Sequence, residues 1–263
     1  MHESRTWHYG LIAEWWANFN TDGPEIDYYR RVVERGQPAL DAGCGTGRLL
    51  LPWLRAGLDV DGSDVSADMI EQCRTRAAAE GFTPTLLVQP LHELDPPRRY
   101  RTIVACGVLG LGSTRQQDEE AIRKLYAALE PGGTLLLDTE VAYSNASRWQ
   151  RWTAEGRAEL PTAWSTDPTR RQTADGTAYT LWSRTIAVDP LDQCIHMAIR
   201  VEKARDGRVL GVEEHELSMR EWFRDELVLM LHHAGFDVVD VFGSYTDRPP
   251  TPDDDVLVFA ARK

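Results

Sequence analysis

The sequence predicts an α/β fold in which a mainly parallel sheet is flanked by helices and an antiparallel meander is inserted. Three observations lead to this prediction. Short strand-like apolar runs alternate with longer helical ones up to about residue 142. A stretch with period-two alternation follows, and helical spacing with two further strand-like runs then returns. With 263 residues, 42% of them hydrophobic, the chain is long enough to bury a substantial core.

The first half of the chain is predicted to alternate strands with helices. Apolar runs typical of buried strands lie at residues 38–42, 58–63, 85–88, 102–106 and 134–138. Helical spacing lies between them at residues 47–56, 66–80 and 116–129. Ser66 is a favoured N-cap and Gly81 a favoured helix stop, while Pro131-Gly132-Gly133 should end the last of these helices.

The second half begins with the predicted meander. Alternation with a period of two occurs at residues 179–186, 195–201 and 209–217. Asp206-Gly207 is a strong hairpin signal between the last two. A helix over residues 222–234, closed by Gly235, and strands at residues 236–242 and 256–260 should then complete the main sheet.

Composition restricts the partners and the location. The 41 acidic and 29 basic residues give a net charge of −12, which repels phosphate backbones, so we expect no nucleic-acid partner. No apolar stretch resembles a signal peptide or a membrane span. The four cysteines have no CxxC spacing, so we expect reduced thiols, no metal site and a cytoplasmic location. The nine tryptophans indicate either packing under a lid or an aromatic wall of a substrate pocket.

The turn after the first strand carries the most specific motif, Asp41-Ala42-Gly43-Cys44-Gly45-Thr46-Gly47. Glycines there let the backbone turn tightly and approach a ligand. The spacing is GxGxG and not the dinucleotide pattern GxGxxG, because position 48 is Arg48. Asp41 would repel a pyrophosphate, whereas a cationic group would be attracted to it. The motif therefore predicts a ligand other than a dinucleotide.

Asp64, at the end of the second strand, is the second candidate binding residue. A carboxylate at that strand end is placed to accept hydrogen bonds from ribose hydroxyls. Val65 and Met69 would supply an apolar wall for an adenine ring. The alternative is that Asp64 only caps the next helix, although Ser66 already has that role.

These motifs, together with Leu129-Glu130-Pro131-Gly132-Gly133 before an apolar strand, resemble class I S-adenosylmethionine-dependent methyltransferases. The resemblance covers residues 35–142, and residues 220–242 fit the same fold. It implies a Rossmann-like, seven-stranded methyltransferase sheet whose last strand is antiparallel. It also implies S-adenosylmethionine as cofactor and S-adenosylhomocysteine as product, bound across the carboxyl ends of the first, second and fourth strands.

The resemblance also assigns cofactor-binding residues. The backbone of Gly43, Cys44 and Gly45 would line the methionyl part, with Asp41 beside it and Asp64 on the ribose. Near the sulfonium it places Cys106 and Gly107. Many members have an acid after the third strand that binds the adenine amino group, and this chain departs from that pattern. Here Gln89 would accept the same hydrogen bond, and the backbone of Leu91 or His92 would meet the ring edge.

The acceptor site is predicted between the N-terminal segment and the inserted meander. The N-terminal segment resembles the helix that covers the cofactor in small-molecule methyltransferases, and Tyr9 and Trp16 are candidates to pack against the sulfonium. The alternative is an amphipathic helix docked on the sheet. The meander resembles the strands that roof the acceptor site in sugar and antibiotic-tailoring N- or O-methyltransferases. Glu140 and Tyr143 are expected to point toward the same cleft.

The resemblance implies transfer of a methyl group to a nitrogen or oxygen of a small-molecule acceptor by in-line displacement. A hydroxyl acceptor would need a general base, and the candidates are His8, Glu140 and His196, the last of which is alternatively a surface residue. The predicted parts are N-terminal lid helices (1–36), a cofactor-binding core (37–142), a substrate-cap insertion (143–218) and the completion of the core (219–263). We expect a monomer or homodimer.

Three alternatives differ from this hypothesis. A protein or RNA methyltransferase would present a cationic groove. A noncatalytic S-adenosylmethionine-binding protein would lose the open pocket over Cys106 or fill it with lid aromatics. A nicotinamide-dependent oxidoreductase is disfavoured by the GxGxG spacing.

Overall fold

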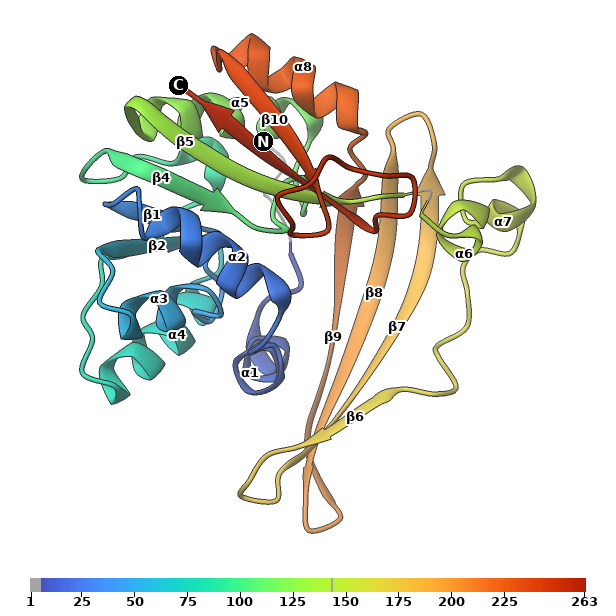
Figure 1. Ribbon diagram of the computed structural model, residues 1–263. Coiled ribbons are helices and arrows are strands. Elements are labelled where there is room, and N and C mark those ends of the chain that lie inside the picture. Colours follow the sequence, from blue (N-terminus) through green and yellow to red (C-terminus); the bar gives the residue numbers. More distant parts are fainter. Residues whose placement is uncertain (1–5, 143) are drawn as a thin grey trace.

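A seven-stranded sheet forms the main body of the computed structural model, which describes residues 6–142 and 144–263 (Figure 1). Its strands lie in the order β10-β11-β5-β4-β1-β2-β3. Their bounds are Ala39–Ala42 (β1), Val60–Asp64 (β2), Leu86–Val88 (β3), Tyr100–Ala105 (β4), Leu129–Glu140 (β5), Val238–Gly243 (β10) and Val256–Arg262 (β11). Among these seven strands, β11 alone runs opposite to the other six. The predicted fold class is thereby confirmed.

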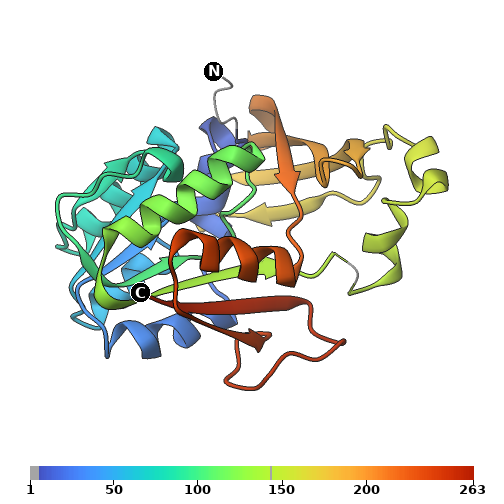
Figure 2. The ribbon, with the colours of Figure 1, turned by 90° about the horizontal axis from the view of Figure 1, so that it is seen from above.

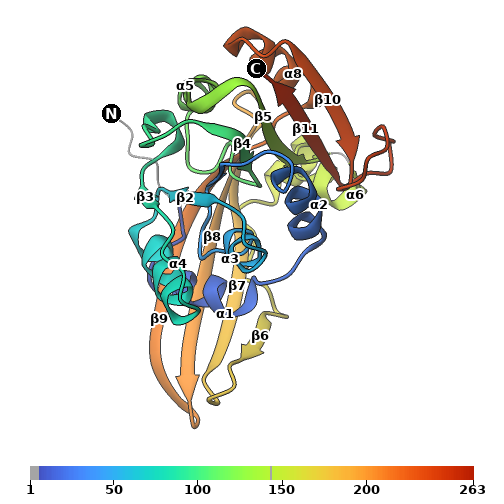
Figure 3. The same cartoon turned by 60° about the vertical axis from the view of Figure 1, so that its left-hand side comes forward.

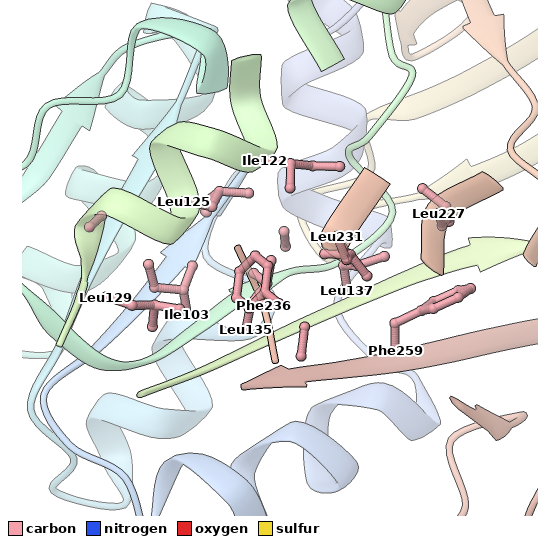
Figure 4. Packing of buried hydrophobic residues seen from close by; sticks show 14 of the residues in the cluster. Ile103, Ile122, Leu125, Leu129, Leu135, Leu137, Leu227, Leu231, Phe236 and Phe259 are labelled. Carbon is pink, nitrogen blue, oxygen red and sulfur yellow. The ribbon is translucent and has the colours of Figure 1, made fainter. Parts of the chain in front are cut away.

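Helices cover both faces of this sheet, as Figures 1 and 2 show. Their bounds are Pro24–Val33 (α2), Leu50–Arg55 (α3), Ala67–Ala79 (α4), Arg115–Ala128 (α5) and Arg224–Ala234 (α8). Successive residues of a strand point to opposite faces. Ile103 therefore packs with Ile122 and Leu231 under α5 and α8 (Figure 4), whereas Val104 packs with Tyr29 and Trp53 under α2 and α3.

A second, antiparallel sheet extends beside the first in the order β6-β7-β8-β9. Its strands are Thr169–Gln172 (β6), Ala178–Asp189 (β7), Cys194–Arg205 (β8) and Arg208–Arg220 (β9). The last three match the predicted meander. The sequence prediction missed β6 and two short helices, α6 (Ala146–Gln150) and α7 (Ala154–Ala158). All four residues of β6 are exposed and polar or charged, so no apolar alternation indicates a strand.

Helix α1 (Gly10–Phe19) packs between α4 of the main body and the second sheet (Figure 3). Trp15 and Phe19 pack on Tyr179 of the second sheet. The Tyr179 hydroxyl donates to the Glu14 carboxylate over 2.8 Å. The alternative prediction of an amphipathic helix docked on a sheet therefore explains Trp15, although the sheet is the inserted one.

Local boundary signals were partly right. Ser66 caps α4, where its hydroxyl accepts the Met69 N–H over 3.2 Å, and Gly235 ends α8 with φ of 109°. Pro131-Gly132-Gly133 was expected to precede the fifth strand, but these residues lie within β5. The pairing with β4 shifts there, from Tyr100 opposite Leu129 to Thr102 opposite Thr134, so the extra residues bulge out of the ladder.

Candidate functional site

A cavity of about 450 Å³ lies at the carboxyl ends of β1, β2 and β4, between α1 and β9. Every predicted cofactor residue except Tyr9 lines it: Trp16, Asp41, Gly43, Cys44, Gly45, Asp64, Val65, Met69, Gln89, Leu91, His92 and Cys106. Two of the predicted bases, His8 and Glu140, also line it. The chain thus brings these sequence motifs into one place.

The glycine turn forms the floor of the cavity. The N–H groups of Gly43 and Cys44 donate to the Ser63 carbonyl over 2.7 and 2.8 Å, which binds the turn to β2. Gly43 has φ of +89° and approaches Val108 so closely that a Cβ atom would lie 2.2 Å from Val108 Cγ1. Above Gly45, with φ of +53°, no atom lies within 4 Å of the position that a Cβ would take. A ligand can therefore approach the Gly45 backbone directly.

Asp64 holds the turn from the neighbouring strand. One carboxylate oxygen accepts the Gly45 N–H over 2.9 Å and the other accepts the Ser66 N–H over 2.8 Å. Burial raises the pKa of Asp64, and these backbone donors oppose the shift. Asp64 is not the helix cap, because the Ser66 side chain has that role.

Asp41 lies deeper in the same site, with 1% of its surface exposed. Burial raises its pKa to about 8, and the nearby charge of Asp64 adds to the shift. Within the described residues, its Oδ2 atom has no hydrogen-bond partner. A buried polar atom without a partner is costly, so this oxygen is suited to a ligand that brings a donor, such as an ammonium group.

The end of the cavity near β3 is formed by polar side chains that already have hydrogen-bond partners in the protein. The Gln89 side-chain oxygen accepts the Asp95 N–H over 3.1 Å, so it is already engaged. The His92 ring lies 3.2 Å from the Gln117 side-chain nitrogen. Gln117 and Ala121 of α5 also line the cavity, and sequence analysis did not single them out. Gln117 lies in the first turn of the helix after the fourth strand, which was the signal that could have indicated it.

The middle of the cavity lies over Cys106 and Gly107, after β4. The Cys106 thiol is 3.2 Å from an Asp138 oxygen, and burial followed by the Asp138 charge raises its pKa well above the usual range. Arg48 reaches this point, with a guanidinium nitrogen 3.8 Å from Cys106 Sγ, and forms an ion pair with the buried Glu25. The sequence prediction missed Asp138 and Glu25, and it used Arg48 only as the residue that breaks the dinucleotide pattern.

The roof of the cavity combines aromatic and apolar side chains. Trp7, Trp16, Leu217 and Met219 line it. His8 accepts the Trp7 indole N–H over 3.2 Å, and its ring meets that of Trp16 edge-on at 5.3 Å between centroids. Burial lowers the pKa of His8 to about 4. The imidazole is therefore neutral near neutral pH and is a weak base.

Two predicted residues do not reach the cavity. Tyr9 is the N-cap residue of α1 and is not part of the lining. His196 pairs with Ser218, whose hydroxyl lies 2.8 Å from its ring nitrogen. Ser218 alternates with Leu217 and Met219, which face the cavity, so His196 lies on the opposite face of the second sheet. The predicted base role of His196 is therefore not supported by its position. Tyr143 lies outside the described residues.

Two carboxylates mark the remaining wall. Glu140, 61% of whose side chain is exposed, pairs with Arg148 at 2.6 Å. Asp118 is 2% exposed and accepts the Gly110 N–H over 3.1 Å and the Ser113 hydroxyl over 2.5 Å. Its other oxygen is 3.7 Å from the buried Arg220. No motif in the sequence indicated Asp118.

The described residues contain no group of three or more His, Cys, Asp or Glu side chains arranged to hold a metal ion. Among them there is also no helix with the length and apolar character needed to cross a membrane.

Comparison with known proteins gives a consistent result. Residues 39–133 match the family model described as a methyltransferase domain. A protein of Geobacillus sp. (strain WCH70) that carries a methyltransferase name is 23% identical over 97% of this chain and 99% of its own length. A solved S-adenosylmethionine-dependent methyltransferase from Clostridium acetobutylicum is similar over 96% of this chain and 97% of its own, with a TM-score of 0.70 and 15% identity. The solved structure of the sugar N-methyltransferase KedS8 from Streptoalloteichus is similar over 100% of this chain and 99% of its own, with a TM-score of 0.66 and 17% identity.

Proposed function

We propose that this chain, a methyltransferase with the class I fold, transfers the methyl group of S-adenosylmethionine to a nitrogen or oxygen of a small-molecule acceptor. The expectation of a methyltransferase enzyme is confirmed by the domain match and by the methyltransferase name of the Geobacillus relative. The acceptor and the residues that serve it belong to the proposal.

The residues of the site fit S-adenosylmethionine. The partnerless Asp41 oxygen suits the ammonium of its methionyl part, and the open space above Gly45 suits close approach of its backbone. Asp64 lies at the strand end suited to ribose hydroxyls. Bound there, the cofactor supplies a methyl group already activated on a sulfonium. S-adenosylhomocysteine would remain as product.

The chain itself aligns the acceptor and excludes water. Leu111, Leu217 and Met219 form an apolar wall, while Trp7, just before α1, and Trp16 of α1 close the cavity from the N-terminal segment. Bringing two reactants together in the right orientation supplies much of the acceleration of a displacement reaction. In this proposal, residues 143–218 act as the cap of the acceptor site and residues 1–36 as its lid.

An amine acceptor is favoured over a hydroxyl acceptor. A hydroxyl needs a base whose pKa is near the working pH. His8, with a pKa of about 4, is poorly matched to that task, and Glu140 is paired with Arg148. An amine needs only to lose its proton before it reacts. The similar sugar N-methyltransferase is in keeping with this preference.

The alternatives have less support. The net charge of −12 disfavours an RNA acceptor, and the roofed cavity of about 450 Å³ suits a small molecule better than a protein. The cavity remains open over Cys106, which disfavours a noncatalytic binding protein.

The observation that carries the proposal is the convergence of Asp41, Gly45 and Asp64 on one cavity. Calorimetric titration of the protein with S-adenosylmethionine and S-adenosylhomocysteine tests it. We expect micromolar binding that Asp64→Ala weakens at least about tenfold, because the carboxylate binds hydroxyls and holds the glycine turn. Asp225→Ala, on the exposed side of α8, is the matched control and should bind normally. If the folded wild-type protein binds neither ligand, the proposal is wrong.

A further inference from the structure

Asp138, near the end of β5, collects four hydrogen-bond donors beneath the cavity. One of its oxygens accepts the hydroxyls of Tyr29 and Tyr245 over 2.9 and 2.6 Å and lies 3.2 Å from the Cys106 thiol. The other accepts the backbone N–H of Gly107. Asp138 is 4% exposed and does not line the cavity, so it has no contact there with a ligand. Its contacts act on the residues that do.

The two tyrosines come from parts of the chain that are remote in sequence. Tyr29 lies on α2 and is fully buried, while Tyr245 lies in the loop between β10 and β11. Burial, together with the charge of Asp138, raises the pKa of both phenols. Both therefore keep their protons and donate them to the carboxylate.

The loop that carries Tyr245 is held in an unfavourable backbone conformation. Ser244 and Tyr245 have φ of 48° and 56°, a region that side chains other than glycine rarely adopt. The loop is fastened by Asp254, which accepts the Ser244 hydroxyl over 2.6 Å and forms two hydrogen bonds with the Arg248 guanidinium. Strain of this kind persists only where surrounding contacts enforce it, and it is concentrated at functional sites. Its effect here is to place the Tyr245 hydroxyl on Asp138.

The bond from Gly107 determines the direction of a carbonyl group. In a planar trans peptide, the N–H and the preceding C=O point in opposite directions. Because the Gly107 N–H points to Asp138, the carbonyl oxygen of Cys106 points away from Asp138. Cys106 and Gly107 line the cavity, whereas Asp138, Tyr29 and Tyr245 are not part of its lining.

We infer that Asp138, held by Tyr29 and Tyr245, is a positioning residue that turns the Cys106 carbonyl oxygen toward the sulfonium and its methyl group. The inference rests on the proposed function. A carbonyl oxygen attracts a positively charged sulfonium and the polarised C–H bonds of its methyl group. S-adenosylhomocysteine has neither the charge nor the methyl group, so the contact should distinguish the two ligands.

The test measures the affinities of S-adenosylmethionine and S-adenosylhomocysteine for Tyr245→Phe, Tyr29→Phe and Asp138→Asn by calorimetry. Tyr28→Phe is the matched control, because its ring packs on Tyr29 and Tyr245 but its hydroxyl does not bond Asp138. We expect Tyr29→Phe and Tyr245→Phe each to weaken the affinity for S-adenosylmethionine roughly three- to tenfold. The affinity for S-adenosylhomocysteine should change less than about twofold. Asp138→Asn should have the larger effect, and Tyr28→Phe none.

A second readout is independent of any ligand. The Gly107 amide proton, bonded to a carboxylate, should resonate far downfield in the NMR spectrum of the ligand-free protein, and Asp138→Asn should move it upfield. If Tyr29→Phe and Tyr245→Phe weaken the affinities for both ligands equally, or weaken neither, the positioning role is wrong. If the wild-type protein binds neither ligand, the proposed function fails and this inference fails with it. If the wild-type protein binds both ligands and the variants keep the same ratio of the two affinities, the positioning role is rejected and the proposed function stands.

Discussion

Gly45 donates its backbone N–H to the Asp64 carboxylate over 2.9 Å, so the residue suited to the ribose also fastens the glycine turn after β1 to the end of β2. The other Asp64 oxygen fastens Ser66, which begins α4. Part of the effect of losing Asp64 must therefore appear in the absence of any ligand.

We expect Asp64→Asn to lower the free energy of unfolding by about 1–3 kcal/mol without cofactor. The amide has one accepting oxygen, so one buried N–H of Gly45 or Ser66 loses its partner. Urea unfolding of the ligand-free protein measures the loss. Asp225→Asn, an exposed substitution, should change it by less than about 0.5 kcal/mol. Equal stability of the two variants would mean that Asp64 has no structural role.

Asp41 should release a proton when S-adenosylmethionine binds. Its pKa of about 8 means that the carboxyl group is mainly protonated at pH 7 in the ligand-free protein. An ammonium group beside it favours the ionised form. We expect release of roughly one proton at pH 7 and an affinity that rises with pH up to about 8. Calorimetry in buffers with different ionisation enthalpies counts the protons.

Asp41→Asn is the control for this linkage, since it keeps the size of the side chain but cannot ionise. Its binding should release almost no proton and should be nearly independent of pH in this range. Proton release that persists in Asp41→Asn would assign the titration to another group.

Elements with local signals were predictable from the sequence. Ser66 begins a helix and Gly235 ends one through interactions that act within a few residues. The glycine turn needs residues that tolerate positive φ. Strand β6 has no such signal. Its strand conformation depends on pairing with β7, where Thr169 lies opposite Leu181.

The part of the site that sequence analysis missed depends on tertiary structure in the same way. Tyr29, Asp138 and Tyr245 meet although more than a hundred residues separate each tyrosine from the aspartate. No local pattern relates them. The face on which His196 lies could not be predicted from the local sequence either. Period-two alternation defines two faces of a strand but not which face meets the core.

His8 should make stability depend on pH below neutrality. Its pKa of about 4 in the folded protein lies below the usual histidine pKa of about 6.5, so between these values the unfolded chain binds a proton that the folded chain does not. Stability is therefore lost as pH falls from 6.5 toward 4, by up to roughly 3 kcal/mol. Urea unfolding at pH 7.5 and pH 4.5 measures the difference.

His8→Gln should remove this contribution, because glutamine can still accept the Trp7 N–H but does not titrate. Asp41, whose raised pKa of about 8 favours folding as the pH falls, contributes in the opposite direction in both proteins, so the difference between His8→Gln and the wild-type protein measures the effect of His8. His233→Gln, at an exposed position of α8, should behave like the wild-type protein. The same pH dependence in His8→Gln and in the wild-type protein would show that His8 is not the group responsible.

Helix α1 should loosen when its first N–H groups lose their carboxylates. Gly10 donates to Asp68 of α4 over 2.7 Å, and Leu11 donates to Glu213 of β9 over 2.8 Å, so α1 is tied to a helix of the main body and to the second sheet. We expect Asp68→Asn and Glu213→Gln each to lower stability by about 0.5–2 kcal/mol, because anionic caps favour a helix N-terminus. Amide hydrogen exchange should become faster in α1 first. Unchanged exchange there would exclude the capping role.

The buried pair of Asp118 and Arg220 should be strongly coupled. Their side chains are 3% and 5% exposed, with Arg220 Nε 3.7 Å from Asp118 Oδ2, and burial raises the pKa of Asp118. Removing one charge leaves the other buried without its counterion, which costs about 3–5 kcal/mol. We therefore expect Arg220→Met to destabilise the protein by about that amount.

Removing both charges should cost less than the sum of the single changes. In Asp118→Asn combined with Arg220→Met, the amide can still accept the Gly110 N–H and the Ser113 hydroxyl, and no unpaired charge remains. A double-mutant cycle from urea unfolding should give a coupling energy of about 1–3 kcal/mol. Additive losses would mean that the two charges do not interact across this distance. In that case Arg220 would act mainly through its other side-chain contacts, the hydrogen bond to the Asp192 carbonyl and the packing on the Trp222 ring.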